Sequence, residues 1–118
     1  MIKGIGIDII ELSRIKESIQ NNTKFVDRIL TEKEKAFFMK LKSEKRKIEF
    51  LAGRFASKEA FAKATGTGIG KLSFKDIEIL HDDQGAPTIT VNGYTNYRIF
   101  ISISHSNEFA VAQVILED

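Results

Sequence analysis

The segment that decides the fold is Gly53-Arg54-Phe55-Ala56-Ser57-Lys58-Glu59-Ala60-Phe61-Ala62-Lys63. We expect it to belong to a helix over residues 43–65, because apolar side chains recur at steps of three and four residues and predict a stripe that faces a core. That stripe comprises Ile48, Leu51, Ala52, Phe55, Glu59 and Ala62. Glu59 is unexpected there, since a carboxylate taken from water needs a counter-charge, a metal or several hydrogen bonds.

Lys63 offers the simplest partner for Glu59. It follows Glu59 by four residues, in the order that favours an ion pair along a helix. On these residues alone, a local ion pair on a helix flank is the preferred interpretation. A second carboxylate brought close by the fold would favour a binding site instead.

Length and composition narrow the class of protein. The chain has 118 residues, which fits a single domain over residues 1–118 with a substantial core. It contains no cysteine, so disulfide frameworks and thiolate zinc sites are excluded, and any metal must be bound by oxygen or imidazole. The sequence shows neither a signal-peptide pattern nor an apolar run of about 18 residues, so we expect a cytoplasmic protein.

The distribution of charge is more informative than the total, because the formal net charge is only +2. Basic residues form one group before the central helix and another nearer the N-terminus: Lys40, Lys42, Lys45, Arg46 and Lys47, and Arg14, Lys16, Lys24 and Arg28. Such groups are usually solvated faces. The functional alternatives are a phosphate-bearing small molecule, a nucleic acid or an acidic protein.

The N-terminal stretch over residues 2–10 alternates as a strand. One face carries Ile5, Ile7 and Ile9, and the other carries Gly4, Gly6 and Asp8. Glycine weakens a strand and is best tolerated where a ligand or another backbone comes close. The two glycines therefore indicate a cleared approach to the Asp8 carboxylate or, equally well, a glycine-marked bulge beside a solvated aspartate.

The rest of the chain predicts further helices and then strands. The helices are expected over residues 11–20, 25–30 and 31–41, the last starting at a capping box formed by Thr31 and Glu34. The strands are expected over residues 77–80, 88–91, 99–105 and 110–116. We therefore predict an α+β fold in which a mainly antiparallel sheet packs against a long central helix.

Two further features could contact a ligand. Residues 66–70, Gly-Thr-Gly-Ile-Gly, follow a helix and precede strands, which is the wrong order for a dinucleotide-binding loop. A turn is the simplest interpretation, although backbone amides there could still approach a ligand. His105 ends a strand, where a histidine is most often a capping or surface residue but is also suited to phosphate binding or acid–base chemistry.

Asp8 and Glu59 are the candidate metal ligands. If the fold brings them together, they form an oxygen site suited to Mg²⁺, which completes its coordination shell with waters and substrate phosphates. Four basic residues could then neutralise phosphate charge: Arg46, Arg54, Lys58 and Lys63. This combination indicates transfer of a phosphoryl-type group.

Several stretches together carry a family resemblance. Gly4-Ile5-Gly6-Ile7-Asp8 and the segment from Phe55 to Lys63 resemble the two signature motifs of the 4′-phosphopantetheinyl transferases. The total length, residues 46–54, the loop over residues 66–70 and Ser102-Ile103-Ser104-His105 resemble the short bacterial subfamily, the holo-acyl-carrier-protein synthases. The resemblance covers nearly the whole chain, and the order and separation of the motifs argue against chance agreement.

The resemblance implies an enzyme with a defined reaction. Asp8 and Glu59 are implied to bind Mg²⁺ together with the pyrophosphate of coenzyme A, while the metal and Lys63 stabilise its charge. A serine hydroxyl of acyl carrier protein attacks the β-phosphorus, giving holo-carrier protein and adenosine 3′,5′-bisphosphate in support of fatty acid biosynthesis. Either Glu59 or a metal-bound water removes the serine proton.

The resemblance also implies binding surfaces and an assembly. Arg46, Arg54 and His105 are implied to contact the nucleotide phosphates, and the loop from Gly66 to line the coenzyme A site. The surface that docks the acidic helix of the carrier protein is matched by Arg14, Lys24, Phe25 and Arg28. Residues 21–23 stand where relatives often have more basic residues, so weaker or less salt-sensitive docking is expected. The subfamily works as a homotrimer whose active sites are shared between neighbouring subunits.

Two rival functions use the same residues differently. A Mg²⁺-dependent phosphohydrolase would use Asp8 and Glu59 with water as the acceptor. A nucleic-acid-binding module would use the basic run over residues 40–47, and its binding would weaken steeply with salt. The scarcity of aromatic residues within that run argues against the second rival.

Overall fold

The computed structural model describes residues 1–67 and 72–118. In chain order its elements are β1 (Ile2–Glu11), α1 (Leu12–Asn21), α2 (Phe25–Ile29), α3 (Glu32–Lys40), α4 (Glu44–Thr65), η1 (Phe74–Asp76), β2 (Ile77–His81), β3 (Pro87–Val91), β4 (Arg98–His105) and β5 (Phe109–Glu117). The α+β class is confirmed. Every element expected from the sequence is present, with each end within one residue of the expectation, and the short 3₁₀ turn η1 was not expected.

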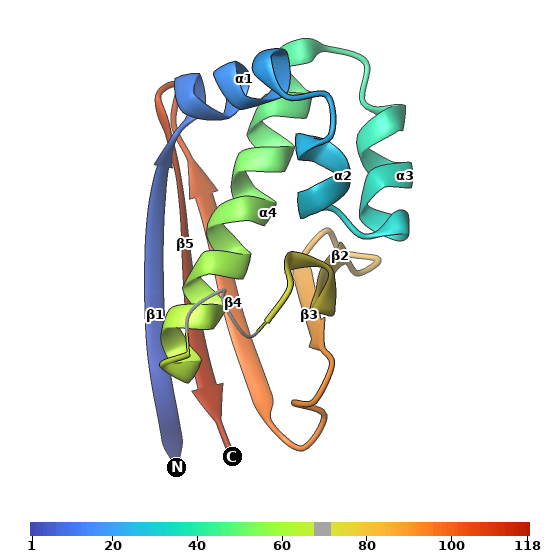
Figure 1. Cartoon of the computed structure of the whole chain (residues 1–118). Coiled ribbons are helices and arrows are strands. Elements are labelled where there is room, and N and C mark those ends of the chain that lie inside the picture. Colours follow the sequence, from blue (N-terminus) through green and yellow to red (C-terminus); the bar gives the residue numbers. More distant parts are fainter. Residues whose placement is uncertain (68–71) are drawn as a thin grey trace.

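Within the described residues, the strands form two antiparallel sheets instead of one. A three-stranded sheet has the order β1-β5-β4, and β2 pairs with β3 as a separate hairpin. Helix α4 lies along one face of the larger sheet, and α1, α2 and α3 lie on the side of α4 that faces away from it (Figure 1). The central helix is therefore enclosed between the larger sheet on one side and the shorter helices and the β2–β3 hairpin on the other (Figure 1).

The caps of α4 follow directly from the sequence. The Ser43 side chain accepts a hydrogen bond from the Arg46 backbone N–H at the first turn. Gly66 ends the helix with φ of 78°, a left-handed conformation that glycine adopts without strain. The predicted helix is thus confirmed at both ends.

Helix α4 is buried on nearly every side, so the predicted single buried stripe is wrong. Phe55 and Glu59, which belong to that stripe, are only half-buried, whereas Arg54, Ser57 and Lys58, which lie outside it, are buried. The reason is the enclosure of α4, because residues on both of its sides contact other elements. One core cluster lies mainly between α4 and the strands, and a second lies mainly between α4 and the shorter helices.

The glycines of β1 allow α4 to pack directly on this strand. A Cβ atom on Gly6 would lie 1.9 Å from the carbonyl oxygen of Ala60, and one on Gly4 would lie 1.8 Å from that of Ala64. Neither position has room for a side chain, so the close approach that the glycines permit is that of the α4 backbone. The glycine-bearing face of β1, which also carries Asp8, is therefore the face that meets α4.

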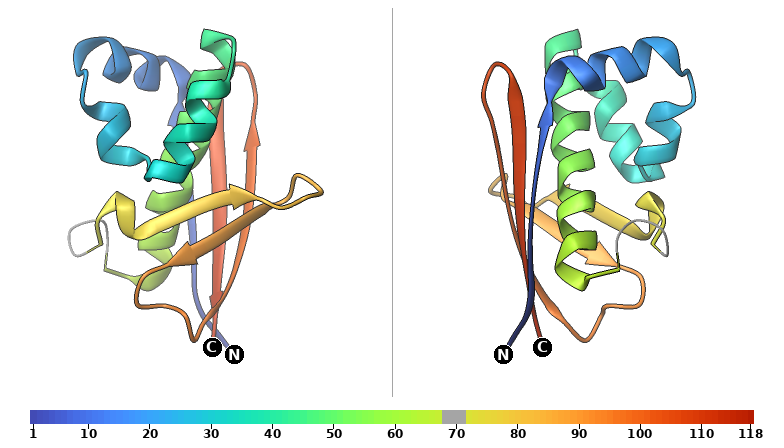
Figure 2. Two further views of the ribbon diagram at one scale, coloured as in Figure 1. Left: turned by 90° about the vertical axis from the view of Figure 1, so that its right-hand side faces the viewer. Right: turned by 60° about the vertical axis from the view of Figure 1, so that its left-hand side comes forward.

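The opposite face of the larger sheet is apolar and uncovered in the single chain. Its exposed side chains include Ile5, Ile7 and Ile9 of β1 and Phe100 of β4, with exposed fractions of 59%, 57%, 63% and 47%. The helices cover only the other face of this sheet (Figure 2). Contiguous exposed apolar surface of this kind is typical of an interaction site.

Within the described part of the chain, no helix has both the length and the apolar character that crossing a membrane requires.

Candidate functional site

The first candidate site forms where β1 meets the C-terminal half of α4. Lys63 donates from Nζ to Oδ1 of Asp8 at 3.0 Å and to the Ile7 carbonyl oxygen at 3.0 Å. The local ion pair between Glu59 and Lys63 is therefore not the arrangement that forms. Lys63 instead joins α4 to the strand that carries Asp8.

Glu59 lies close enough to Asp8 for the two carboxylates to repel each other. Burial raises the pKa of Glu59 above its ordinary value, the negative charge of Asp8 raises it further, and Lys63 lowers it. The Asp8 side chain is 16% exposed and that of Lys63 is 53% exposed, so the site opens to solvent. The fold thus places Asp8, Glu59 and Lys63, from two distant parts of the sequence, in one site.

The chemistry of this site fits a divalent cation. A cation bound by both carboxylates would offset the repulsion that raises the pKa of Glu59. Mg²⁺ is commonly bound by only one or two carboxylates and retains several waters or substrate oxygens. Within residues 1–67 and 72–118 there is no group of three or more His, Asp or Glu side chains that could hold a metal, which is compatible with such an open site.

A second candidate site is a pocket of about 530 Å³ between α4, β4 and the hairpin of β2 and β3. Its polar lining includes Arg46, Glu49, Arg54, His81 and His105. Sequence reasoning missed Glu49 and His81. Glu49 lies within residues 46–54, which carry part of the family resemblance, and its Oε2 is 3.6 Å from Nδ1 of His105. Nothing in the sequence places His81 beside the pocket.

Arg54 is the buried cation of this pocket, with an exposed fraction of 4%. Its Nη2 donates to the Ile79 carbonyl oxygen at 3.4 Å and to Nδ1 of His81 at 3.2 Å, and its guanidinium lies 4.1 Å from the ring centre of Phe50. Burial lowers the pKa of Arg54 to about 10, against the raising effect of Glu34, so the side chain stays charged at neutral pH. Its Nε is buried without a hydrogen-bond partner among the described residues.

The two sites lie on opposite flanks of α4. The helix meets β1 through Ala60 at Gly6, whereas at Gly53 it approaches Ile103 of β4, where an added Cβ would lie 3.2 Å from Cγ2. Strands β1 and β4 are the two outer strands of the sheet. Residues implied to bind one coenzyme A molecule are thus divided between two edges of the same subunit.

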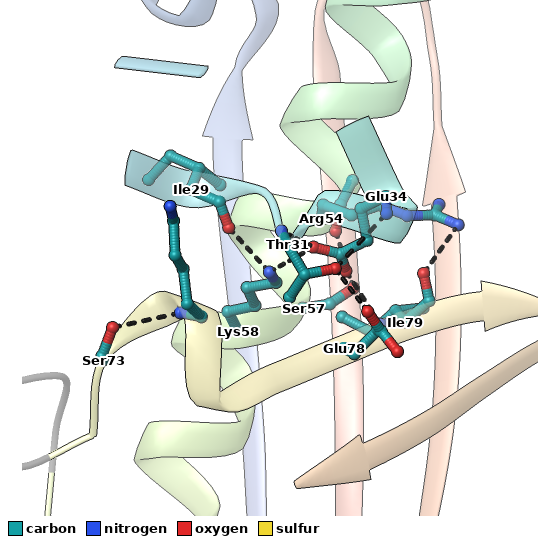
Figure 3. Close-up of polar contacts among 11 residues, drawn as sticks. Ile29, Thr31, Glu34, Arg54, Ser57, Lys58, Ser73, Glu78 and Ile79 are labelled. Carbon is teal, nitrogen blue, oxygen red and sulfur yellow. Dashed lines mark hydrogen bonds and ion pairs between the residues drawn. The ribbon is translucent and has the colours of Figure 1, made fainter. Parts of the chain in front are cut away.

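Lys58 belongs to neither site, so the expectation that it neutralises phosphate charge is wrong. Its side chain is fully buried, and Nζ donates to Oε1 of Glu34 at 2.6 Å and to the Ile29 carbonyl oxygen at 2.7 Å (Figure 3). Burial lowers the pKa of Lys58, and the charge and hydrogen bond of Glu34 oppose this effect. Lys58 therefore joins α4 to α2 and α3.

Glu34 connects this buried pair to the hairpin (Figure 3). Its Oε1 also accepts from the Thr31 backbone N–H, which confirms the predicted capping box, while Oε2 accepts from the Ile79 backbone N–H at 2.8 Å. Arg54 donates a hydrogen bond to the carbonyl oxygen of the same Ile79. Side chains of α3 and α4 thus satisfy the free edge of β2, which fixes the hairpin beside the pocket.

The structure describes most of the remaining predicted site residues. Arg14, Lys24 and Arg28 are exposed around α1 and α2, and Phe25 is half-buried with its ring centre 6.3 Å from that of Phe55. Arg46 and Gly66 are exposed. Residues 68–70 of the predicted glycine loop lie outside the described residues.

Comparisons with known proteins agree with this geometry. The family model of the 4′-phosphopantetheinyl transferase superfamily matches residues 4–114. A holo-[acyl-carrier-protein] synthase of Oceanobacillus iheyensis is 60% identical over 117 residues, covering 99% of this chain and 98% of the relative. One from a Geobacillus strain is 62% identical over 118 residues, with the same coverage.

Solved structures show the same similarity in three dimensions. A Bacillus anthracis holo-(acyl-carrier-protein) synthase, crystallised in complex with CoA (3′,5′-ADP), has a TM-score of 0.91 and 55% identity and covers 99% of this chain and 97% of its own. The Helicobacter pylori synthase in complex with coenzyme A has a TM-score of 0.82 and 38% identity, with coverage of 96% and 99%.

These matches define the class of protein as a transferase related in sequence and fold to enzymes that modify acyl carrier protein. The chain belongs to the 4′-phosphopantetheinyl transferase superfamily. The family recognised from the sequence motifs, including its short bacterial type, is confirmed.

Replacing Asp8 tests whether the two carboxylates share one site. We expect Asp8→Asn to lower the pKa of Glu59 in metal-free protein, because it removes a raising charge and frees Lys63 to interact with Glu59. Carbon-detected NMR titration of the Glu59 carboxyl group measures this change. Asp83→Asn, at an exposed turn residue, is the control that should leave the titration unchanged. An unaltered Glu59 titration in Asp8→Asn would contradict the shared site.

Proposed function

We propose that the chain transfers the 4′-phosphopantetheine group from coenzyme A to a serine hydroxyl of apo acyl carrier protein. The products are holo acyl carrier protein and adenosine 3′,5′-bisphosphate. The observation that carries this proposal is the juxtaposition of Asp8, Glu59 and Lys63 in a chain similar over its full length to enzymes named for this activity. We take residues 1–118 as one transferase domain that acts in fatty acid biosynthesis in the cytoplasm.

Asp8 and Glu59 would hold Mg²⁺, the metal that two carboxylates and a pyrophosphate suit best. When bound, the metal supplies positive charge that offsets the negative charge of the pyrophosphate. Lys63 is long and half-exposed, so its ammonium can turn from Asp8 to a substrate oxygen and stabilise the leaving group.

Glu59 has a second property that suits proton transfer. Its carboxylate can accept a proton and lies at the site where the serine hydroxyl would react. We propose that Glu59 accepts the serine proton directly or through an intervening water. The attack on the β-phosphorus then forms the new P–O bond to serine and breaks the bond to the bisphosphate leaving group.

The pocket on the other flank of α4 would bind the adenosine end of coenzyme A. Arg54 is charged, is held against Phe50, and has a buried Nε without a partner among the described residues. Arg46 and His105 line the same pocket and add donors for a phosphate. The loop that starts at Gly66 would complete the coenzyme A site.

We propose that the protein acts as a homotrimer with active sites between subunits. Within one subunit, α4 separates the site of Asp8 and Glu59 from the pocket of Arg54. A cyclic arrangement can bring the β1 edge of one copy to the β4 edge of the next, and the rotation closes a ring. The exposed apolar face of the sheet, which includes Ile5, Ile7, Ile9 and Phe100, would be buried in this assembly.

The carrier protein would dock on α1 and α2. Arg14, Lys24 and Arg28 are exposed there, and charge of this sign attracts an acidic helix and sets its register. Phe25 is half-buried and supplies an apolar contact beside these charges.

Intact mass spectrometry tests the transfer directly. With Mg²⁺ and coenzyme A, we expect apo acyl carrier protein to gain one phosphopantetheine. Glu59→Gln should keep the fold and reduce transfer at least about 100-fold, the scale of losing one group that stabilises transition-state charge. Glu32→Gln, on the exposed side of α3, is the control and should retain activity. A carrier that stays unmodified, with phosphate released to water, would favour a phosphohydrolase.

A double charge reversal tests the docking surface. We expect Arg14→Glu with Arg28→Glu to raise KM for the carrier protein about tenfold, which corresponds to about 1.4 kcal/mol, and to leave KM for coenzyme A unchanged. Lys33→Glu with Lys40→Glu makes the same change in charge at exposed positions of α3 and should have a much smaller effect. If KM for coenzyme A rose equally in the Arg14 and Arg28 variant, the docking assignment would be wrong.

Mixed trimers test the shared active site. Glu59→Gln and Arg46→Glu subunits should each be nearly inactive alone, because each lacks one half of the site. Co-expressed with two different tags and purified as mixed trimers, they should recover about a third of wild-type activity, because each mixed trimer has one intact interface out of three. Glu59→Gln mixed with Asp8→Asn should recover nothing. Sedimentation analysis should give the mass of three chains, and absence of recovery in the first mixture would contradict a shared site.

A further inference from the structure

His81 stands beside the phosphate pocket without a role in the proposed reaction. It is the last residue of β2 and pairs with Pro87 of β3, so the hairpin holds its backbone in place. Its side chain is exposed to the pocket of Arg54. The hairpin is in turn fixed to α3 and α4 through Ile79, two residues earlier.

The contact between His81 and Arg54 fixes the state of the imidazole. A guanidinium has only donors, so Nδ1 of His81 must accept the hydrogen bond of 3.2 Å from Nη2 of Arg54. The ring proton of the neutral imidazole then lies on Nε2. Burial lowers the pKa of His81 and the Arg54 charge lowers it further, while Asp82 opposes both, so the neutral form that can accept this bond predominates at neutral pH.

Aromatic contacts hold both partners of this hydrogen bond. The Phe37 ring lies 5.7 Å from the His81 ring and 5.1 Å from the Phe50 ring, and Phe50 also packs against the guanidinium of Arg54. Arg54 is therefore held on one face by Phe50 and at Nη2 by the Ile79 carbonyl oxygen and His81. Of the two acceptors, His81 makes the shorter hydrogen bond and is the only side chain.

We propose that His81 is a positioning residue that orients the Arg54 guanidinium for the 3′-phosphate of coenzyme A and thereby favours this substrate over its dephosphorylated form. The inference rests on the proposed function, which places the adenosine end of coenzyme A in this pocket. Loss of the His81 acceptor leaves Arg54 charged but allows its guanidinium to rotate. A bidentate contact with a phosphate then forms less readily. The reacting pyrophosphate lies at the other site, so the chemical step is unaffected.

Two variants of matched shape separate the hydrogen bond from bulk. In His81→Asn, Oδ1 occupies the place of Nδ1 and keeps an acceptor, whereas His81→Leu has a similar volume and none. We expect His81→Leu to raise KM for coenzyme A about fivefold, the scale of one hydrogen bond, with kcat within about twofold of wild type. His81→Asn should remain close to wild type. With 3′-dephospho-coenzyme A, all three proteins should have the same KM.

Direct binding makes the inference independent of catalysis. In calorimetry, His81→Leu should bind adenosine 3′,5′-bisphosphate about fivefold more weakly than the wild type. Its affinity for adenosine 5′-monophosphate should be unchanged. Three outcomes would each overturn the proposal. His81→Leu could leave KM and affinity unchanged, or it could lose as much affinity for the dephosphorylated ligands as for the phosphorylated ones. His81→Asn could also lose as much affinity as His81→Leu. A wild-type protein that binds the bisphosphate but transfers nothing would contradict the proposed function alone.

Discussion

The fully buried ion pair between Lys58 and Glu34 is the interaction on which the rest of the structure depends. Removing one partner of such a pair leaves an uncompensated charge in the core and typically costs about 3–5 kcal/mol. Here the pair also joins four elements, because Lys58 bonds α2 and α3 while Glu34 bonds the backbone of β2. This network fixes the rotation of α4, and Glu59, the residue after Lys58, therefore faces Asp8.

The same network also shapes the second site. The Ile79 backbone N–H donates to Glu34, and the Ile79 carbonyl oxygen accepts from Arg54. Side chains of α3 and α4 thus provide the hydrogen-bond partners of β2 at this edge. The hairpin carries His81, Gly85 and Pro87 to the pocket, which explains how a separate two-stranded sheet can form part of a defined wall. A single buried carboxylate, Glu34, thus links the orientation of the site of Asp8 and Glu59 with that of the pocket of Arg54.

Much of the fold could be predicted from the sequence, because its signals are local. The capping box at Thr31, the cap at Ser43 and the glycine that ends α4 each act within a few residues. The environment of Lys58 could not be predicted, because its partner Glu34 lies 24 residues away and is already explained locally by the capping box. Periodicity likewise failed for α4, because a helix enclosed on both sides has no single buried stripe.

Asp8, Glu59 and Lys63 could be singled out from the sequence, but which of them interact could not be predicted. Asp8 and Glu59 stood out because carboxylates are unexpected among glycines and apolar residues, and the family resemblance named their roles. Helical spacing favoured an ion pair between Lys63 and Glu59, but in the fold Lys63 pairs with Asp8. The division of the predicted ligands between two edges of the sheet depends on how α4 crosses the strands, which no local pattern encodes.

The contact of Gly4 and Gly6 with the α4 backbone brings β1 close to α4 at the site of Asp8 and Glu59. Because main chain meets main chain there, no side chain acts as a spacer between β1 and α4. The separation of β1 from α4 is therefore set by contact between their backbones. A side chain introduced at Gly4 or Gly6 would therefore widen the gap across which Asp8 and Glu59 face each other.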